Sequence, residues 1–128
     1  MDQPVASNQQ KQTLNSEQLT PSDGLPLSVY MITYNNGVTI ERALQSVADW
    51  ADEVIVVDSY STDGAQDIIP RYTEKLYQFE TKDLREKYQY AHDQCINPWT
   101  LFIDADEWLM DDIKKEISTI IRGTPSCD

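Results

Sequence analysis

Short apolar runs of strand length alternate along this chain with stretches in which apolar residues recur every three or four positions. The strand-like runs, rich in β-branched and aromatic residues, cover residues 27–33, 53–58, 76–79 and 99–103. Strands that alternate with helices predict a mostly parallel sheet whose crossover connections are helical. The predicted fold class is therefore α/β, with roughly four strands.

The helical stretches have one apolar face each. In the first, apolar residues recur at the helical spacing at Ile40, Ala43, Leu44, Val47 and Ala48. A short helix should end or kink near Pro70. A third helix, over residues 84–95, is predicted to bury Leu84, Tyr88, Ala91 and Cys95. The last, over residues 110–121, is predicted to bury Met110, Ile113, Ile117, Ile120 and Ile121.

Residues 1–26 differ in composition from the rest of the chain. They are rich in Gln, Ser, Asn and Thr, contain no aromatic residue and show no helical or strand period. Such a segment buries too little apolar surface to offset the entropy of ordering, so we expect a disordered polar leader. Residues 27–128 are then expected to form one ligand-binding domain.

The charge balance excludes one class of partner. The chain has 22 acidic and 10 basic residues, for a net charge of -12. Nucleic-acid binding draws most of its non-specific affinity from Lys and Arg against phosphates, so we expect no nucleic-acid partner. The apolar runs are far shorter than the ~20 residues of a transmembrane helix, and no signal-peptide pattern opens the chain. We therefore expect a cytoplasmic location and no transmembrane segment.

Polar residues gather where the predicted strands end. They are Thr33, Tyr34, Asn35, Asp58, Asp104 and Asp106. Ligands of open parallel sheets bind outside the carboxyl ends of the strands, which meet at one edge. The sequence therefore predicts a ligand site at this edge. The chain lacks a P-loop motif and a Gly-x-Gly-x-x-Gly motif, so phosphate binding of those two kinds is not expected.

Asp104 and Asp106 follow a predicted strand and are separated only by Ala105. Two carboxylates so placed can turn toward one hard cation, and Mg²⁺ or Mn²⁺ leaves coordination places for phosphate oxygens. Such a cation would bridge an acidic protein to an acidic ligand. Taken alone, an Asp-x-Asp pair more often caps a following helix; its position directly after a strand favours the metal site.

Asp58 ends a very apolar run, where an unpaired carboxylate would be costly. It could bind a nucleobase or ribose, or it could cap the loop over residues 59–64, and the residues alone favour neither. Trp108, beside the acidic pair, is the best candidate for stacking on a sugar, although core packing is the commoner role of a tryptophan.

Four segments together resemble the first half of inverting family 2 glycosyltransferases, and in particular the bacterial lipopolysaccharide-core glucosyltransferase-like members. They are residues 27–36 (LSVYMITYNN), 44–49 (LQSVAD), 50–63 (WADEVIVVDSYSTD) and 99–107 (WTLFIDADE). The resemblance implies a GT-A nucleotide-binding fold. It also implies that Thr33 and Tyr34 surround a uracil, that Asp58 binds this base, and that Asp104 and Asp106 hold the ribose, diphosphate and metal.

The resemblance also implies an activity. The chain would bind a UDP-sugar donor and a divalent cation, Mn²⁺ or Mg²⁺, for transfer of a hexose to a glycan or lipid-linked saccharide, in lipopolysaccharide biosynthesis or a related pathway. A protein acting on such an acceptor could lie at the inner membrane face.

Family members carry their catalytic base in a second half, so we expect this chain to be an incomplete glycosyltransferase without that base, and its catalytic residues stay unassigned. The alternative is a non-catalytic sugar-nucleotide-binding or scaffold protein. Such a protein could self-associate through an exposed sheet edge.

Overall fold

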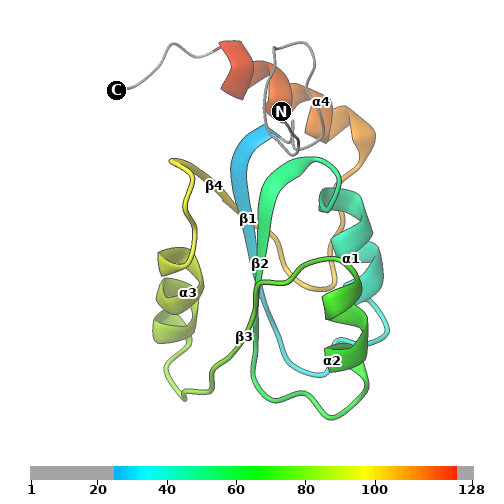
Figure 1. Cartoon of the computed structure of the whole chain (residues 1–128), viewed down its shortest axis with the longest axis vertical. Coiled ribbons are helices and arrows are strands. Elements are labelled where there is room, and N and C mark those ends of the chain that lie inside the picture. The colour runs from blue at the N-terminus through cyan, green and yellow to red at the C-terminus, as the bar shows by residue number, and fades with distance from the viewer. Residues whose placement is uncertain (1–24, 124–128) are drawn as a thin grey trace, which may run out of the picture.

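The computed structural model describes residues 25–123, which form a four-stranded sheet with helices on both faces (Figure 1). The strands are β1 (Leu25–Thr33), β2 (Ala51–Asp58), β3 (Leu76–Gln78) and β4 (Trp99–Phe102). The helices are α1 (Ile40–Val47), α2 (Ala65–Ile68), the 3₁₀-helix η2 (Ile69–Arg71), α3 (Leu84–Asp93) and α4 (Asp111–Gly123). The predicted α/β class is confirmed, and Pro70 lies in the short 3₁₀ turn that ends α2.

The sheet has the strand order β3-β2-β1-β4, and every neighbouring pair is parallel. β1 therefore lies in the centre, paired with β2 up to Thr33↔Asp58 and with β4 up to Tyr30↔Phe102. Because all strands run in one direction, their carboxyl ends lie at one edge. In Figure 1 the carboxyl ends of β1 and β2 point downward, and α4 lies at the upper end of the molecule.

β1 begins at Leu25, two residues before the predicted start and inside the range expected to be a leader. Leu25 is fully buried, and its N–H donates to the Trp50 carbonyl at 2.9 Å. The boundary was misplaced because Pro26 interrupts the apolar pattern, and a proline is tolerated near the start of a strand. Residues 1–24 of the expected leader lie outside the described residues.

The larger core lies between the sheet and the helices α1 and α2. Its α1 contribution is Ile40, Ala43, Leu44 and Val47, which are all fully buried. These positions recur at the helical spacing, so one face of α1 meets the sheet, as predicted. Leu27, Val29 and Met31 of β1 pack in the same core, since alternate residues of a strand share one face.

α3 covers the opposite face of the sheet, over a smaller core of Ile55, Val57 and Ala91. Aromatic side chains of β1, β3 and β4 extend this core. Ala91 is the only fully buried residue of α3, and Leu84 is exposed, so the predicted burial of Leu84 is wrong. Leu84 lies in the first turn, whereas the residues of α3 that pack in the smaller core, Tyr90 and Ala91, lie further along the helix.

The predictions for the last two elements need correction. β4 was expected to be a buried strand, but all four of its residues are only half-buried because β4 lies at the sheet edge. In the predicted helix over residues 110–121, Met110, Ile113 and Ile120 are exposed rather than buried, and Ile121 is the one buried residue of α4. α4 crosses the end of the sheet instead of lying along a face, so only part of its predicted apolar face is buried among residues 25–123 (Figure 1).

Candidate functional site

The loops that follow β1, β2 and β4 all leave the carboxyl edge of the sheet. Since β1 lies between β2 and β4, its loop stands between the other two. The predicted site residues Thr33, Asp58 and Asp104 therefore come from three adjacent strand ends. The structure thus brings the predicted residues to one edge, as parallel topology requires.

Hydrogen bonds join the loop after β1 to the loop after β2. The Asn35 N–H donates to Ser61 Oγ at 2.8 Å, and Asn35 Oδ1 accepts from the Thr62 N–H at 2.9 Å. The Gly37 N–H donates to Asp63 Oδ2 at 2.8 Å, and a Cβ on Gly37 would lie only 2.9 Å from that oxygen. The two loops therefore form one connected surface, and a larger residue at position 37 would force the Asp63 side chain to shift.

Thr33 and Tyr34 differ in what they offer a ligand. Thr33 is buried, and its hydroxyl donates to Asn36 Oδ1 at 2.8 Å. The backbone N–H of Tyr34 donates to the same oxygen at 3.0 Å, while 58% of Tyr34 is exposed. Thr33 and Asn36 shape the loop, and the Tyr34 side chain is the part that a ligand can reach.

The Asp58 carboxylate is fully buried and already bonded to the protein. Its Oδ1 accepts from the Ser61 hydroxyl, and its Oδ2 accepts from the Ser61 N–H at 3.0 Å and from Gln78 Nε2 at 3.0 Å. These contacts favour loop capping over direct contact with a base, the two roles that the residues alone left open. Gln78 was missed by sequence reasoning because it lies on β3, 20 residues further along.

The acidic loop, residues 104–107, places two carboxylates outward. Asp104 and Asp106 are exposed, whereas Ala105 between them is buried. Glu107 closes the loop, because its Oε1 accepts from the Asp104 N–H at 3.0 Å and its N–H donates to the Asp104 carbonyl at 3.0 Å. Glu107 thus caps the acidic loop itself and not the helix that follows.

The acidic loop fits a hard divalent cation. Partial desolvation raises the pKa of the Asp104 carboxyl, and the negative charges of Glu107 and Asp106 raise it further. A cation would relieve this repulsion. Within residues 25–123, no group of three or more His, Cys, Asp or Glu side chains gathers as a closed metal cage. Mg²⁺ is commonly held by one or two carboxylates plus water and substrate phosphates, which is what Asp104 and Asp106 could provide.

One face of α1 and its N-cap hold the acidic loop and the residues after it. Thr39 Oγ1 donates to the carbonyl of Ala105 at 3.0 Å, and the Arg42 guanidinium lies 3.9 Å from the centre of the Trp108 ring. Ser46 Oγ accepts from the backbone N–H of Leu109, the residue after Trp108, at 3.1 Å. Arg42 therefore already occupies the ring of Trp108, the residue expected to stack on a sugar.

Comparison with known proteins identifies the family. A family model described as "Glycosyl transferase family 2" matches residues 28–127. The chain belongs to glycosyl transferase family 2. An uncharacterized glycosyltransferase of Rickettsia bellii is 40% identical over 97 residues, which cover 76% of this chain and 33% of that protein.

Two further relatives of this family 2 chain have more descriptive names. The lipopolysaccharide core biosynthesis glycosyltransferase LpsC of Rhizobium meliloti is 33% identical over 90 residues, covering 66% of this chain and 33% of LpsC. The crystal structure of S. aureus TarS 1-349 matches with a TM-score of 0.65 at 29% identity, over 76% of this chain and 32% of TarS. The predicted family and the GT-A-like fold are thereby confirmed. The chain spans about a third of the length of these relatives.

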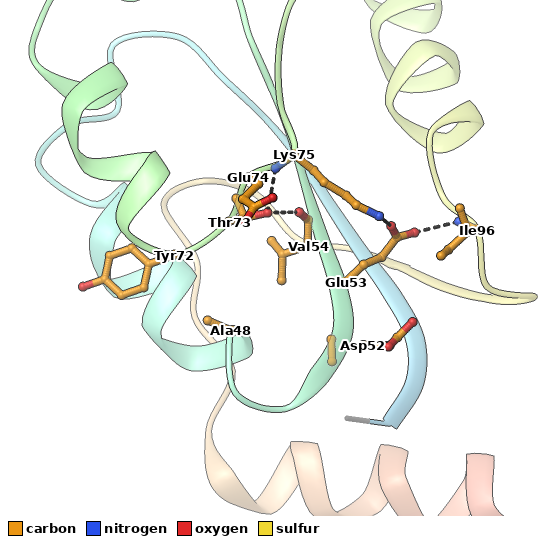
Figure 2. Close-up of a pocket in the computed structure, with 10 residues that line it drawn as sticks. Ala48, Asp52, Glu53, Val54, Tyr72, Thr73, Glu74, Lys75 and Ile96 are labelled. Atoms are coloured by element: carbon orange, nitrogen blue, oxygen red, sulfur yellow. Dashed lines mark hydrogen bonds and ion pairs between the residues drawn. The ribbon is translucent and has the colours of Figure 1, made fainter. Parts of the chain in front are cut away.

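The opposite edge of the sheet has a cavity of about 340 Å³, and Glu53, one of three acidic residues that line it, is already ion-paired with Lys75 (Figure 2). The Glu53 side chain is 4% exposed and accepts from Lys75 Nζ at 2.5 Å, Ser28 Oγ at 2.5 Å and the Ile96 N–H at 2.6 Å. Burial opposes the charge of Glu53, but these bonds outweigh it and lower its pKa. In this family 2 chain, we therefore interpret the Glu53 cluster as a structural tie rather than a ligand site.

Proposed function

We propose that this chain is the donor-binding part of a glycosyltransferase. It binds a UDP-sugar together with a divalent cation, for transfer of a hexose to a glycan or lipid-linked saccharide acceptor. Family membership supports the general activity. The observation that carries the proposal is the outward pair Asp104 and Asp106, adjacent to the connected loops that follow β1 and β2.

The nucleoside is assigned to the loops after β1 and β2. The exposed ring of Tyr34 contacts the uracil, and Thr33 and Asn35 fix the course of the loop around it. Asp58 supports this site from beneath, because its carboxylate holds the backbone of Ser61 in place. In this proposal Asp58 belongs to the base site but acts on the ligand indirectly, through the loop that it holds in place.

The diphosphate and ribose are assigned to the acidic loop, with Asp104 and Asp106 as the metal ligands. Asp104 and Asp106 would hold this Mn²⁺ or Mg²⁺, which would stabilise the departing nucleoside diphosphate as a Lewis acid. The Thr39–Ala105 hydrogen bond holds the acidic loop against α1, and Arg42 holds Trp108 directly after it, so the two carboxylates are presented at a fixed place. The proposal assigns no catalytic base among residues 25–123.

The remaining assignments follow from likeness and are part of the same proposal. LpsC, a lipopolysaccharide core glycosyltransferase, suggests a lipopolysaccharide-type acceptor and hence a cytoplasmic site at the inner membrane face. None of the helices within residues 25–123 has the length and apolar character needed to cross a bilayer. Self-association through the sheet edge at β4 is also proposed.

A thermal-shift titration with UDP, with and without Mn²⁺, tests the donor site. Ligand at ~100 times its dissociation constant should stabilise the protein by about 2.7 kcal/mol. We expect this stabilisation only when UDP and Mn²⁺ are both present, because the cation must neutralise the repulsion between the acidic loop and the diphosphate. Asp104→Asn should abolish it while leaving the melting temperature of the free protein nearly unchanged, since Asp104 is exposed.

Asp49→Asn is the matched control, because Asp49 is an exposed acid in the turn before β2, at the opposite edge of the sheet. Its Mn²⁺-UDP stabilisation should equal that of the unsubstituted chain. A folded, unsubstituted chain that shows no shift with UDP and Mn²⁺ would contradict the proposal. An equal loss in Asp49→Asn and Asp104→Asn would show that the effect is one of general charge.

A further inference from the structure

Tyr60 has a backbone conformation that its side chain disfavours. Within residues 25–123, only Asn35 (φ 52°) and Tyr60 (φ 58°) combine a positive φ with a residue other than glycine. Asn tolerates the left-handed region, whereas a bulky side chain there is a genuine outlier. Asn35 also uses this conformation for its two bonds to the neighbouring loop. Tyr60 requires a different explanation.

The contacts around Tyr60 explain its backbone but not its ring. The Tyr60 N–H donates to Gln78 Oε1 at 2.9 Å, and the Ser59 hydroxyl donates to the Phe79 carbonyl at 3.1 Å. A glycine could make the same backbone bond at lower conformational cost. The residue is 55% exposed, and no side chain among residues 25–123 stacks on its ring or bonds its hydroxyl. The tyrosine side chain therefore makes no hydrogen bond or ring contact within the described residues that would offset its strain.

The position of Tyr60 suggests what the ring is for. Thr33 and Asp58 are paired in the β1–β2 register, so Tyr34 and Tyr60 lie one and two residues beyond paired positions on adjacent strands. Both side chains are more than half exposed, and the two loops that carry them are bonded to each other. The two exposed tyrosines thus belong to one connected surface at the carboxyl edge of the sheet.

We propose that Tyr60 is a nucleobase-contacting residue, which packs its ring against the base of the bound nucleoside diphosphate alongside Tyr34. The inference rests on the proposed function, since it assigns a further residue to the same donor site. A neutral, planar base is the part of the donor that an acidic protein can bind without charge repulsion. Aromatic side chains suit this task because every base has a π-face. The strain at Tyr60 is then retained for binding, as at other sites where strain and function coincide.

Calorimetric titration of the chain with UDP in the presence of Mn²⁺, and with uridine alone, tests the assignment. Tyr60→Ala and Tyr60→Gly should each raise the dissociation constant for UDP about tenfold, the usual scale for loss of one base–aromatic contact. The constant for uridine should rise by a similar factor, because uridine has the base but no phosphate. Tyr60→Phe should bind nearly as tightly as the unsubstituted chain.

Stability separates binding from folding. Tyr60→Gly removes the disfavoured conformation, so its melting temperature should rise while its affinity for UDP falls, a combination that general damage to the fold cannot produce. Ile96→Ala is the control, because Ile96 is 70% exposed in the loop before β4, at the opposite edge. Its affinities should be unchanged.

Three results would overturn the inference. In the first, Tyr60→Ala and Tyr60→Gly bind UDP as tightly as the unsubstituted chain, which would leave the proposed donor site standing and remove only Tyr60 from it. In the second, UDP binding weakens but uridine binding does not, which would place the effect at the phosphates or the metal. In the third, the unsubstituted chain binds neither UDP nor uridine, which would overturn the proposed function as well.

Discussion

At the scale of single residues, Glu53 shows how one carboxylate can hold several segments together. Its oxygens accept from Lys75 ahead of β3 and from the backbone of Ile96 ahead of β4, as Figure 2 shows, and also from Ser28 on β1. Removing one partner of a buried ion pair costs about 3–5 kcal/mol. Because Lys75 is 39% exposed, we expect Glu53→Gln to lower the free energy of unfolding by only about 2 kcal/mol in urea titrations at pH 7.

The same residue should give stability a defined pH dependence. The folded-state pKa of Glu53 lies below its ordinary value of 4.5, so its contribution is complete above that value and is lost as the pH falls through the lowered folded pKa. The difference in stability between the unsubstituted chain and Glu53→Gln should therefore shrink below about pH 4.5. Glu74→Gln, an exposed acid beside the same cavity, should behave like the unsubstituted chain. A difference that stays constant down to pH 3 would contradict this role of Glu53.

Asp58 marks the limit of what single residues reveal in the sequence. Its position at the end of an apolar run correctly predicts a strand end that needs polar partners. The choice between ligand contact and loop capping depends on Gln78, which reaches Asp58 only because β3 pairs with β2. Such a partner follows from strand order, and no local pattern around Asp58 could have indicated it.

At the scale of secondary-structure elements, the residues of α4 contribute unequally to the stability of the fold. Ile121 is its one buried residue, at 6% exposed, whereas Ile113 on the same predicted face is 45% exposed. We expect Ile121→Ala to destabilise the fold by about 2 kcal/mol, near the low end for a buried aliphatic residue, because α4 packs only at the end of the sheet. Ile113→Ala should change stability by less than about 0.5 kcal/mol.

Chemical denaturation of the two α4 variants checks this asymmetry. Equal effects of the two substitutions would mean that α4 buries its whole apolar face in solution. A large effect of Ile113→Ala alone would contradict the arrangement seen at the end of the sheet. Circular dichroism of both variants shows whether the remaining helices are kept.

The elements themselves were largely readable from the chain. Two patterns predict α1 and β2 correctly: the helical spacing of Ile40, Ala43 and Leu44, and the apolar run before Asp58. They succeed because the apolar residues of both elements are buried in the structure, as the patterns require. α4 and β4 show the opposite case, since an apolar face indicates which residues could be buried but not what covers them. The place of the acidic loop after a strand predicts it from the sequence. The contacts of Thr39 with Ala105 and of Arg42 with Trp108 join residues far apart in the chain, so only the packed structure reveals them.

At the scale of the whole molecule, the open backbone edge of β4 favours self-association, whereas the net charge of the chain opposes it. Ile103 donates its N–H to Tyr30 on β1, so residues of the other parity in β4, Thr100 and Phe102, direct their N–H groups away from the sheet. Such an edge can pair with a second chain. Each chain, however, has a net charge of -12, and like charges repel.

Salt should therefore promote self-association through β4. Between ~0.01 M and ~1 M salt, the screening length falls from about 30 Å to about 3 Å, which weakens the repulsion but leaves backbone hydrogen bonds available. We expect light scattering to show a rising dimer fraction over this range. Thr100→Pro should reduce the dimer fraction because it removes an outward N–H while sparing the bonds to β1.

Thr100→Val is the matched control for Thr100→Pro, since it changes the side chain and keeps the backbone donor. It should dimerise like the unsubstituted chain. Thr100→Lys offers a second test if the proline lowers stability, because a charge on an edge strand also discourages pairing. A chain that stays monomeric at every salt concentration, or a dimer equally strong in all three variants, would show that the β4 edge is not the contact.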